Sequence, residues 1–410
     1  MAKEYKDLIV GLDIGTAKVM CVVAEVMPGG ELRVAGLGVA ASHGLKRGVV
    51  VNIDATVQSI QQAVREAEMM AACKIERVHT GITGSHIRGQ NSTGMVIVRD
   101  NREVTPVDVA RVVETAKAIN IPNDQRLLLV EPQEFVIDGH EVKEPIGMSG
   151  SRLEVKVHIV TGAQSAAENI LKCVRRCGLE VEQLVLNPSA SSLAVLTADE
   201  KDLGVALVDI GAGTTDVAIF TDGAIRHTAV IPIAGDLITS DIAMALRTPT
   251  KDAEEIKVEH GVAKQLLADP QAQVEVPGLG DRAPRLLSRQ ALAGVIEPRV
   301  EEIYSLVHQV IRESGYEELL SSGIVITGGS AVMPGMVELG EDIFLKPVRK
   351  GNPTYAGALN DMVANPRSAT VMGLLEEARH ARTRGQKAAL QAGSVKTLFG
   401  RAKDWFLGNF

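Results

Sequence analysis

The stretch VALVDIGAGTTDVAIF, residues 205–220, places two apolar segments on either side of a short polar turn. Val205 to Val208 and Val217 to Phe220 have the β-branched and apolar character of buried strands. Asp209 stands near the end of the first segment, and glycine and threonine fill the turn. Because glycine tolerates backbone angles and close approaches that other residues do not, the stretch predicts a tight hairpin with a carboxylate at its edge.

The same pattern occurs near the start of the chain, where residues 9–23 read IVGLDIGTAKVMCVV. Asp13 takes the place of Asp209, and Thr16 and Lys18 are the polar residues of the turn. Two copies of one hairpin, far apart in sequence, are typical of an internally duplicated protein. We therefore expect two related α/β lobes whose hairpins grip one ligand from both sides.

The two turns have the chemistry of a phosphate site. Consecutive backbone amides in a glycine-rich turn form a concave anion site, and threonine hydroxyls add further donors. Carboxylates at strand ends suit Mg²⁺, which keeps most of its water, so Asp13 and Asp209 are predicted to hold the metal directly or through water. The predicted nucleotide contacts of the hairpins are Gly11, Asp13, Gly15, Thr16, Lys18, Asp209, Gly211, Gly213, Thr214 and Thr215.

A third glycine turn follows in the stretch IVITGGSA, residues 324–331. A Gly-Gly turn before a helix start suits a nucleoside and its α-phosphate, so Gly328, Gly329 and Ser330 join the predicted site. Glu255 and Lys257 are predicted to reach the ribose and adenine. One such hairpin is weak evidence, but three glycine turns in this order favour ATP with Mg²⁺ as the ligand. The chain has neither a Walker A motif nor a complete Rossmann fingerprint.

The composition is that of a globular protein with an acidic body and a basic tail. Of 410 residues, 45% are hydrophobic and 23% are charged, and the net charge is −8. Basic residues concentrate after Ala378, so we expect the body to repel nucleic acid and the tail to attract an anionic surface. We expect neither a membrane-spanning segment nor a signal peptide. Reduced thiols without a metal are expected at Cys21, Cys73, Cys173 and Cys177.

Helical spacing at 56–72 and 165–176, between strand patterns, predicts α/β lobes with two insertions. Lobe I is expected over 1–84 and 164–196, and lobe II over 197–228 and 312–378. The first insertion, 85–163, is a small α/β unit with a helix starting at Thr105-Pro106. The second, 229–311, is mainly helical. A flexible linker is expected over 379–394.

One strand of the first insertion has a strict alternation over 153–159. Leu153, Val155, Val157 and Ile159 fall on one face, while Glu154, Lys156 and His158 fall on the other. Such alternation is typical of a sheet with one buried face and one solvated face.

The end of the chain, 395–410, is predicted to form an amphipathic helix. Its apolar positions recur at helical spacing, at Val395, Leu398, Phe399, Ala402, Trp405, Phe406 and Phe410. The helix is too short to cross a bilayer and suits the membrane interface. Docking of this helix on the protein's own body is the other interpretation.

The two hairpins and the Gly-Gly turn resemble the actin, Hsp70 and sugar-kinase superfamily. With the inserted unit and the terminal helix, the chain resembles along nearly its full length the FtsA family of bacterial actin-like cell-division proteins. That resemblance implies a two-lobed fold and a site at the division septum, on the cytoplasmic face of the inner membrane. It also implies head-to-tail filaments, which arise from heterologous contacts, and an inserted unit that contacts its neighbour and later division proteins.

The resemblance further implies that the helical unit binds the C-terminal peptide of FtsZ, the ring protein that such proteins tether. Residues 285–304 match that region, and arginines there would pair with acids of the peptide. The implied partner residues are Arg285, Arg289, Arg299 and Tyr304. From the charges alone, a solvated helix face is the alternative.

Asn187 bears on catalysis. It lies in the segment expected to cross between the lobes, where related ATPases often place a glutamate or glutamine that orients the attacking water. Asparagine cannot act as a general base, so we expect at most slow ATP hydrolysis and assign no catalytic residue. Two alternatives remain open: an actin-like adaptor of type IV pilus assembly, and a small-molecule kinase of the same superfamily.

Overall fold

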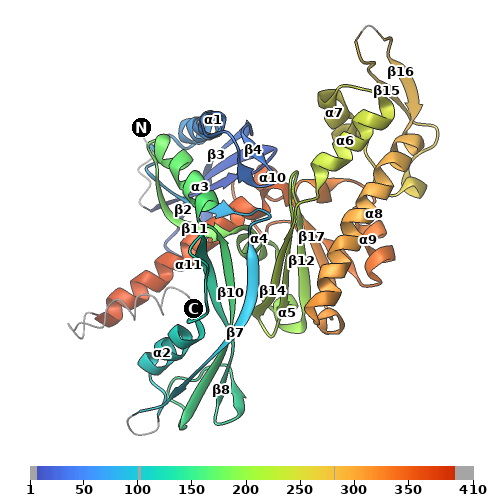
Figure 1. Cartoon of the computed structure of the whole chain (residues 1–410). Coiled ribbons are helices and arrows are strands. Elements are labelled where there is room, and N and C mark those ends of the chain that lie inside the picture. The colour runs from blue at the N-terminus through green and yellow to red at the C-terminus, as the bar shows by residue number, and fades with distance from the viewer. Residues whose placement is uncertain (1–6, 100–102, 281, 393–410) are drawn as a thin grey trace.

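The computed structural model describes residues 7–99, 103–280 and 282–392. Figure 1 shows two lobes with a third unit that projects from them at the bottom of the view. The predicted membrane helix, from Val395 to Phe410, lies outside the described residues. In the part of the chain that is described, no helix is long and apolar enough to cross a membrane.

The first lobe is built on a five-stranded sheet with the order β11-β6-β1-β2-β3. Its strands are β1 (Leu8–Ile14), β2 (Lys18–Val26), β3 (Leu32–Ala41), β6 (Arg77–Ile82) and β11 (Glu180–Leu186). Helices α1 (Ile53–Ala71) and α3 (Gln164–Arg176) pack on its apolar side chains, which confirms the helical spacing. The Asn52 side chain caps α1 by accepting a hydrogen bond from the Ala55 amide. A small hairpin, β4 (Leu45–Lys46) with β5 (Val49–Val50), precedes α1.

The second lobe repeats this topology. Its sheet has the order β14-β13-β12-β17-β18. In each sheet, the three strands that are consecutive in sequence pair antiparallel, and two later strands extend the sheet in parallel on the side of the first of them. The strands are β12 (Val205–Ile210), β13 (Thr215–Thr221), β14 (Ala224–Ile231), β17 (Ile324–Thr327) and β18 (Val348–Lys350). The duplication predicted from the two hairpins is therefore confirmed at the level of strand order.

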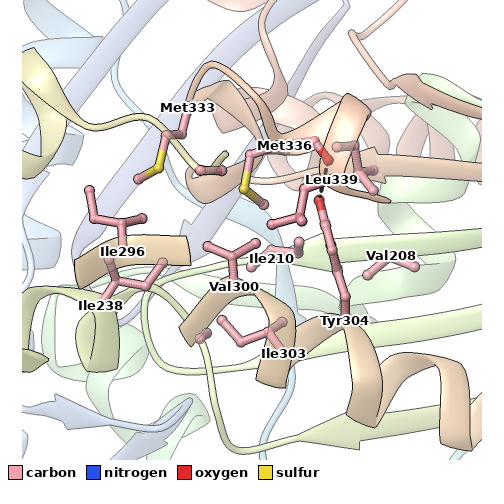
Figure 2. Packing of buried hydrophobic residues seen from close by; sticks show 14 of the residues in the cluster. Val208, Ile210, Ile238, Ile296, Val300, Ile303, Tyr304, Met333, Met336 and Leu339 are labelled. Atoms are coloured by element: carbon pink, nitrogen blue, oxygen red, sulfur yellow. Dashed lines mark hydrogen bonds between the residues drawn. The ribbon is translucent and has the colours of Figure 1, made fainter. Parts of the chain in front are cut away.

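A mainly helical unit is inserted after β14. It contains α6 (Gly235–Leu246), α7 (Thr250–His260), the hairpin β15 (Gln273–Val276) and β16 (Arg285–Ser288), and the long helix α8 (Arg289–Ser314). Helix α8, together with α9 (Met336–Phe344), packs against β12 and β17 to form the core of the second lobe. Figure 2 shows the centre of this core, where residues of α8 and α9 meet Val208 and Ile210.

Two helices lie between the lobes. Side chains of α4 (Asn187–Val195) and α11 (Ala369–Ala392) share a core with β2 of the first sheet and β12 of the second. The remaining short helices are α5 (Ala198–Leu203), α10 (Asn360–Val363) and the single 3₁₀ turns at Gln265–Leu267, Glu317–Leu319, Ser330–Val332 and Pro366–Ser368.

The linker prediction for 379–394 is wrong over its described part, because α11 continues to Ala392. Alanine, arginine, lysine and glutamine dominate this stretch and are good helix formers. Arg379 also pairs with Glu376 one turn earlier, and Arg382 donates to the Leu8 carbonyl of the first lobe. These contacts hold the start of the segment on the protein body as a continuation of the helix.

The inserted α/β unit has a four-stranded sheet with the order β7-β10-β8-β9 and one helix. Its elements are β7 (Arg88–Ile97), α2 (Pro106–Ala116), β8 (Gln125–Ile137), β9 (His140–Val142) and β10 (Arg152–Ala163). Thr105 and Asp108 form a capping box before Pro106, so the predicted helix start is confirmed.

The alternation of β10 is confirmed on its apolar face and wrong at one position of the polar face. The four apolar side chains of the pattern are fully buried. His158, expected in solvent, is only 1% exposed. The reason is tertiary, since β14 of the second lobe packs against this part of the inserted sheet and Thr228 contacts the imidazole.

Candidate functional site

A cavity of about 560 Å³ lies between the lobes, where the predicted glycine turns meet. It is lined by both hairpin turns, the Gly-Gly turn, the start of α4, parts of α7 and α8, and the segment before α11. A larger cavity of about 850 Å³ lies between the inserted unit, β11 and β14, but none of the described residues that line it belongs to the glycine turns. The smaller cavity is therefore the candidate nucleotide site.

The two hairpins turn in the same way and touch each other. The Gly15 amide donates to the Lys18 carbonyl at 2.9 Å, and the Gly211 amide donates to the Thr214 carbonyl at 2.9 Å. A Cβ atom on Gly213 would lie 2.7 Å from the Thr16 hydroxyl oxygen and 2.9 Å from the Arg47 backbone, so a larger residue would force the two turns apart. The second turn thus meets the first across the cleft, and glycine is required for that approach.

Three buried carboxyl groups face this junction: Asp13, Asp209 and Asp216. Burial raises the pKa of Asp13 to about 6, against the attraction of Lys18 and aided by the charge of Asp209. Burial also raises the pKa of Asp216 to about 8, with Asp209 adding repulsion. A concentration of carboxyl groups in a poorly solvated cleft disfavours their charged forms, and a bound cation would reverse that penalty.

Hydrogen bonds fix Asp209 and Asp216 in place. Ser191 and Thr370 donate to one oxygen of Asp209, at 2.7 and 3.3 Å. Thr83, at the end of β6 in the first lobe, donates to Asp216 in the second. The Thr83–Asp216 bond therefore spans the cleft between the lobes.

Lys18 supplies a positive charge at the same end of the cavity. Its ammonium donates to the Arg367 carbonyl at 2.5 Å, and burial lowers its pKa, which the Asp13 carboxylate partly offsets. A partly desolvated ammonium beside threonine hydroxyls and turn amides is suited to an anion such as phosphate.

The Gly-Gly turn closes over the second hairpin. Gly328 has a φ of +88°, and a Cβ atom there would lie 2.4 Å from a carboxylate oxygen of Asp209. The Ser330 hydroxyl donates to the Gly211 carbonyl at 2.9 Å. Nearby, the Lys257 ammonium pairs with Glu254 at 2.6 Å and donates to Thr239 at 2.8 Å.

Most predicted nucleotide residues line this cavity. They are Asp13, Gly15, Thr16, Lys18, Asp209, Gly211, Gly213, Thr214, Lys257, Gly328, Gly329 and Ser330.

The structure places three predicted contacts elsewhere. Gly11 lies under α11, where a Cβ atom would be 2.8 Å from the Val371 carbonyl, so its role is helix packing. Thr215 is fully buried and donates its hydroxyl to the Ile233 carbonyl at 2.8 Å. The Glu255 side chain is 60% exposed and faces Lys251, because one step along a helix turns a side chain by about 100°. Its neighbour Glu254 lines the cavity instead.

The arginines predicted to bind a partner lie in two different places. Arg285 lies on β16 and Arg299 pairs with Asp241 and Glu302 on the helical unit. Arg289, in contrast, lines the nucleotide cavity, and its Nε donates to the His260 carbonyl at 2.8 Å.

Tyr304 is a wrong prediction as a partner residue. It is fully buried in the core of the second lobe, and its hydroxyl donates to the Met336 carbonyl at 2.8 Å (Figure 2). Helical periodicity places Tyr304 on the face of α8 that packs against the sheet.

Sequence reasoning missed several residues that line the cavity. Asp216 closes the hairpin motif itself, so its position at the turn was a usable signal. Thr83, Arg367 and Thr370 come from segments without a local motif, and only the fold brings them to the site. Asn187, which the sequence singles out, lines the cavity too, and its side-chain oxygen is buried without a hydrogen-bond partner.

Family models match two parts of this chain. Residues 206–373 match the model described as Cell division protein FtsA, and residues 84–161 match the SHS2 domain inserted in FTSA. The chain is 54% identical to the Cell division protein FtsA of Pseudomonas aeruginosa over 410 residues, covering 98% of each protein.

Solved structures share the fold at low sequence identity. A chain of the PilM–PilN type IV pilus biogenesis complex aligns with a TM-score of 0.66 and 19% identity, covering 90% of this chain and 98% of that one. MreB 5 of Spiroplasma citri bound to AMPPNP aligns with a TM-score of 0.56 and 14% identity, covering 93% and 99%. These likenesses confirm the predicted two-lobed actin-like fold, and the second family model confirms its inserted unit.

Proposed function

The chain belongs to the FtsA family of cell-division proteins, and on that premise we propose that it binds ATP with Mg²⁺ between its lobes and tethers the FtsZ ring to the membrane. The observation that carries the nucleotide proposal is the contact between the two duplicated turns, with Gly213 against Thr16 and the carboxyl groups beside them. The structural neighbour with bound AMPPNP supports the same ligand class.

The residues at the turns fit the phosphates of ATP. Thr16, Thr214 and Lys18 provide hydroxyl and ammonium donors beside the turn amides. In the described part of the chain, no group of three or more His, Cys, Asp or Glu residues is arranged to hold a metal. Asp13 and Asp209 would therefore hold Mg²⁺ together with water and phosphate oxygens, as magnesium prefers. The bound metal would supply charge neutralisation for the phosphates.

The opposite end of the cavity fits the nucleoside. Lys257 and Glu254 offer polar groups for the ribose, while Val258 and Met333 provide apolar surface for a base. Arg289 also lines the cavity, with its Nε bonded to the His260 carbonyl, and its guanidinium would contact the base.

We propose that hydrolysis is slow. Asn187 has an acceptor oxygen at the cavity wall and no proton-accepting group at neutral pH. A steady-state turnover above about 1 s⁻¹ for the pure protein would contradict this proposal.

For the FtsZ peptide, the proposed surface is the side of the helical unit that carries Arg285 and Arg299. Leu286, beside Arg285 on β16, is 69% exposed and offers apolar contact next to the charges. A peptide with both acidic and apolar residues fits this combination. Arg299 would exchange its present pairs with Asp241 and Glu302 for acids of the peptide.

We propose that the same protein forms head-to-tail filaments on the cytoplasmic face of the inner membrane at the septum, where it contacts later division proteins. Each copy would hold the anionic surface through residues 395–410. One short helix binds weakly, whereas many helices on one filament bind strongly because the local concentration is high.

One experiment tests the tether as a whole. The full chain and a chain ending at residue 392 are pelleted with anionic vesicles, with and without a fluorescent FtsZ C-terminal peptide. We expect the full chain to carry the peptide into the pellet and the shortened chain to leave both in solution while still binding ATP. Lipid binding without peptide recruitment would contradict the tether.

Matched variants then separate the sites. Arg299→Glu should lose the peptide and keep ATP, while Asp209→Asn should lose ATP. Arg152→Glu is the control, because Arg152 forms an ion pair with Glu154 on the inserted unit, away from both proposed sites.

A further inference from the structure

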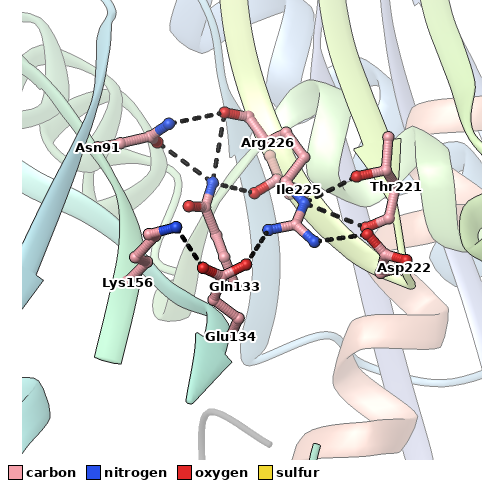
Figure 3. A network of polar contacts seen from close by, with 8 residues as sticks. All are labelled: Asn91, Gln133, Glu134, Lys156, Thr221, Asp222, Ile225 and Arg226. Atoms are coloured by element: carbon pink, nitrogen blue, oxygen red, sulfur yellow. Dashed lines mark hydrogen bonds and ion pairs between the residues drawn. The ribbon is translucent and has the colours of Figure 1, made fainter. Parts of the chain in front are cut away.

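The inserted unit is connected in sequence to the first lobe, but it forms a polar interface with the second. Figure 3 shows this interface, in which side chains of β7 and β8 contact the edge strand β14. Gln133 donates to the Ile225 carbonyl at 2.8 Å, and Asn91 donates to the Arg226 carbonyl at 3.2 Å. These amides satisfy carbonyl groups that an edge strand otherwise leaves open.

Arg226 is the centre of the interface. It is 7% exposed and pairs with Glu134 of the inserted unit at 3.4 Å and with Asp222 of its own lobe at 2.8 Å. Glu134 also accepts from Lys156 on the inserted sheet (Figure 3). Separating the two surfaces would break the Arg226–Glu134 pair together with the hydrogen bonds that Gln133 and Asn91 donate to β14.

Buried His158 extends the same interface. One ring nitrogen lies 2.6 Å from the Asn91 side-chain oxygen and the other lies 2.9 Å from the Thr228 hydroxyl of β14. The inserted unit and β14 therefore share a continuous set of paired polar groups, and we expect them to move together.

The base of the inserted unit packs into the core of the first lobe through Ile87 and Val160, and its covalent connection to that lobe begins at the nucleotide cavity. Thr83, the residue that bonds to Asp216 across the cleft, is followed by Gly84 with a φ of +139° and then by β7. The chain returns at Ala163, whose amide donates to His86 at 3.2 Å, so the outgoing and returning strands are tied together. The outgoing crossing thus begins at a residue that lines the cavity, and the returning crossing is tied to it through His86.

We propose that Thr83 is a positioning residue that couples occupation of the cavity to the inserted unit, which packs on both lobes. This proposal rests on the proposed binding of ATP. Thr83 donates to Asp216 in the structure described here. A phosphate group in the cavity offers the same hydroxyl a charged acceptor, and hydrogen bonds to charged acceptors are the stronger ones. Exchange of that partner changes the position of the chain that enters β7.

The exchange of the Thr83 hydrogen-bond partner is therefore local. The interface with β14 transmits its effect to the rest of the inserted unit. When the lobes change their relative angle, the contacts around Arg226 hold the facing part of the inserted sheet on β14. The crossings at 83–88 and 161–164 then absorb the movement. In this way the nucleotide state would set the orientation of the unit that the family resemblance assigns to filament contacts.

Hydrogen exchange of the full chain, with and without ATP·Mg²⁺ at saturation, tests this inference. We expect amides at 84–88 to change their exchange rates by about fivefold or more, a typical size for coupling between sites, while amides of β14 stay unchanged. Thr83→Val removes the donor at nearly constant volume and should abolish the change at 84–88. Thr80→Val is its control, because Thr80 lies on the same strand and donates to the Leu12 carbonyl inside the first lobe.

Arg226→Met tests the interface separately. The variant should bind ATP as the wild type does. Its amides along β14 and the facing β8 should exchange faster, and the change on ATP binding should no longer be confined to residues 83–88 and 161–164. Arg349→Met is the control, since Arg349 pairs with Glu200 within the second lobe.

The outcomes are distinct. A wild type that binds no ATP overturns the proposed function and this inference with it. A wild type that binds ATP without a change at 84–88, or a Thr83→Val variant that keeps the full change, overturns the coupling alone.

Discussion

Replacement of His158 by glutamine should remove a defined part of the acid sensitivity of this protein. Burial and the neighbouring His227 lower the pKa of His158 to about 3, whereas an exposed histidine titrates near 6.5. The folded protein therefore keeps His158 neutral under conditions in which the unfolded chain protonates it. Stability contributed by this group is present above pH 6.5 or so and is lost as the pH falls toward about 3.

The size of the effect follows from the pKa of the unfolded chain. A pH of about 5 is roughly 1.5 units below the pKa of the imidazole in the unfolded chain. Each unit corresponds to about 1.36 kcal/mol, so protonation of the unfolded chain favours unfolding by about 2 kcal/mol. Glutamine has no proton to gain in this range and keeps both a donor and an acceptor for Asn91 and Thr228. The variant should therefore lose about 2 kcal/mol less than the wild type between about pH 7.5 and pH 5.

Urea unfolding followed by far-ultraviolet circular dichroism measures this difference. The comparison is between the pH-dependent losses of the two proteins, so other histidines with lowered pKa values, such as His79 and His86, cancel. A variant with lower stability at every pH but the same loss as the wild type would refute the reasoning, since His158 would then be accessible to protons in the folded state.

Three further outcomes are expected at the cavity and the core. Gly328→Ala should weaken ATP binding about tenfold or more in calorimetry, because the added Cβ meets Asp209 and the positive φ strains alanine; unchanged affinity would contradict the proposed packing. Arg289→Ala should weaken ATP binding about tenfold and leave inorganic tripolyphosphate unaffected, whereas Arg299→Ala should change neither; equal losses for both ligands would instead assign Arg289 to the phosphates. Tyr304→Phe should lower the free energy of unfolding by about 1 kcal/mol in urea and leave binding of the FtsZ peptide unchanged, and a loss of peptide affinity without destabilisation would reinstate it as a partner residue.

The candidate site was predictable where its residues belong to one short motif. Asp13 and Asp209 were found because strand, turn and strand follow each other within a few residues, and the local chain alone forces the carboxylate to the end of the strand. Gly328 was found for the same reason. Thr83 and Thr370 were not, since each comes from a segment whose local pattern carries no sign of a ligand.

The sequence-based predictions are wrong where a shift of one residue, or one packing partner, decides where a side chain lies. Glu255 and Glu254 are adjacent on α7, and the orientation of the helix alone selects which of them lines the cavity. Arg289 is predicted at the partner surface because the resemblance covers residues 285–304 as one stretch, yet the first residue of α8 lies at the cavity. The linker after Ala378 was expected from its charge, and its helix-forming residues prevailed.

The amino-acid sequence by itself determined the duplicated lobes, the two aspartate hairpins, the glycine turns and the start of α2, because each depends on residues close together in the chain. Only the tertiary structure determined which polar groups leave water. The alternation of β10 specifies two faces of a strand but not what later covers them, and β14, distant in sequence, turns the solvated face at His158 into an interface. In the same way, Thr83 and Asp216 acquire their relation only when two lobes meet, since burial is a property of the packed fold and not of the local chain.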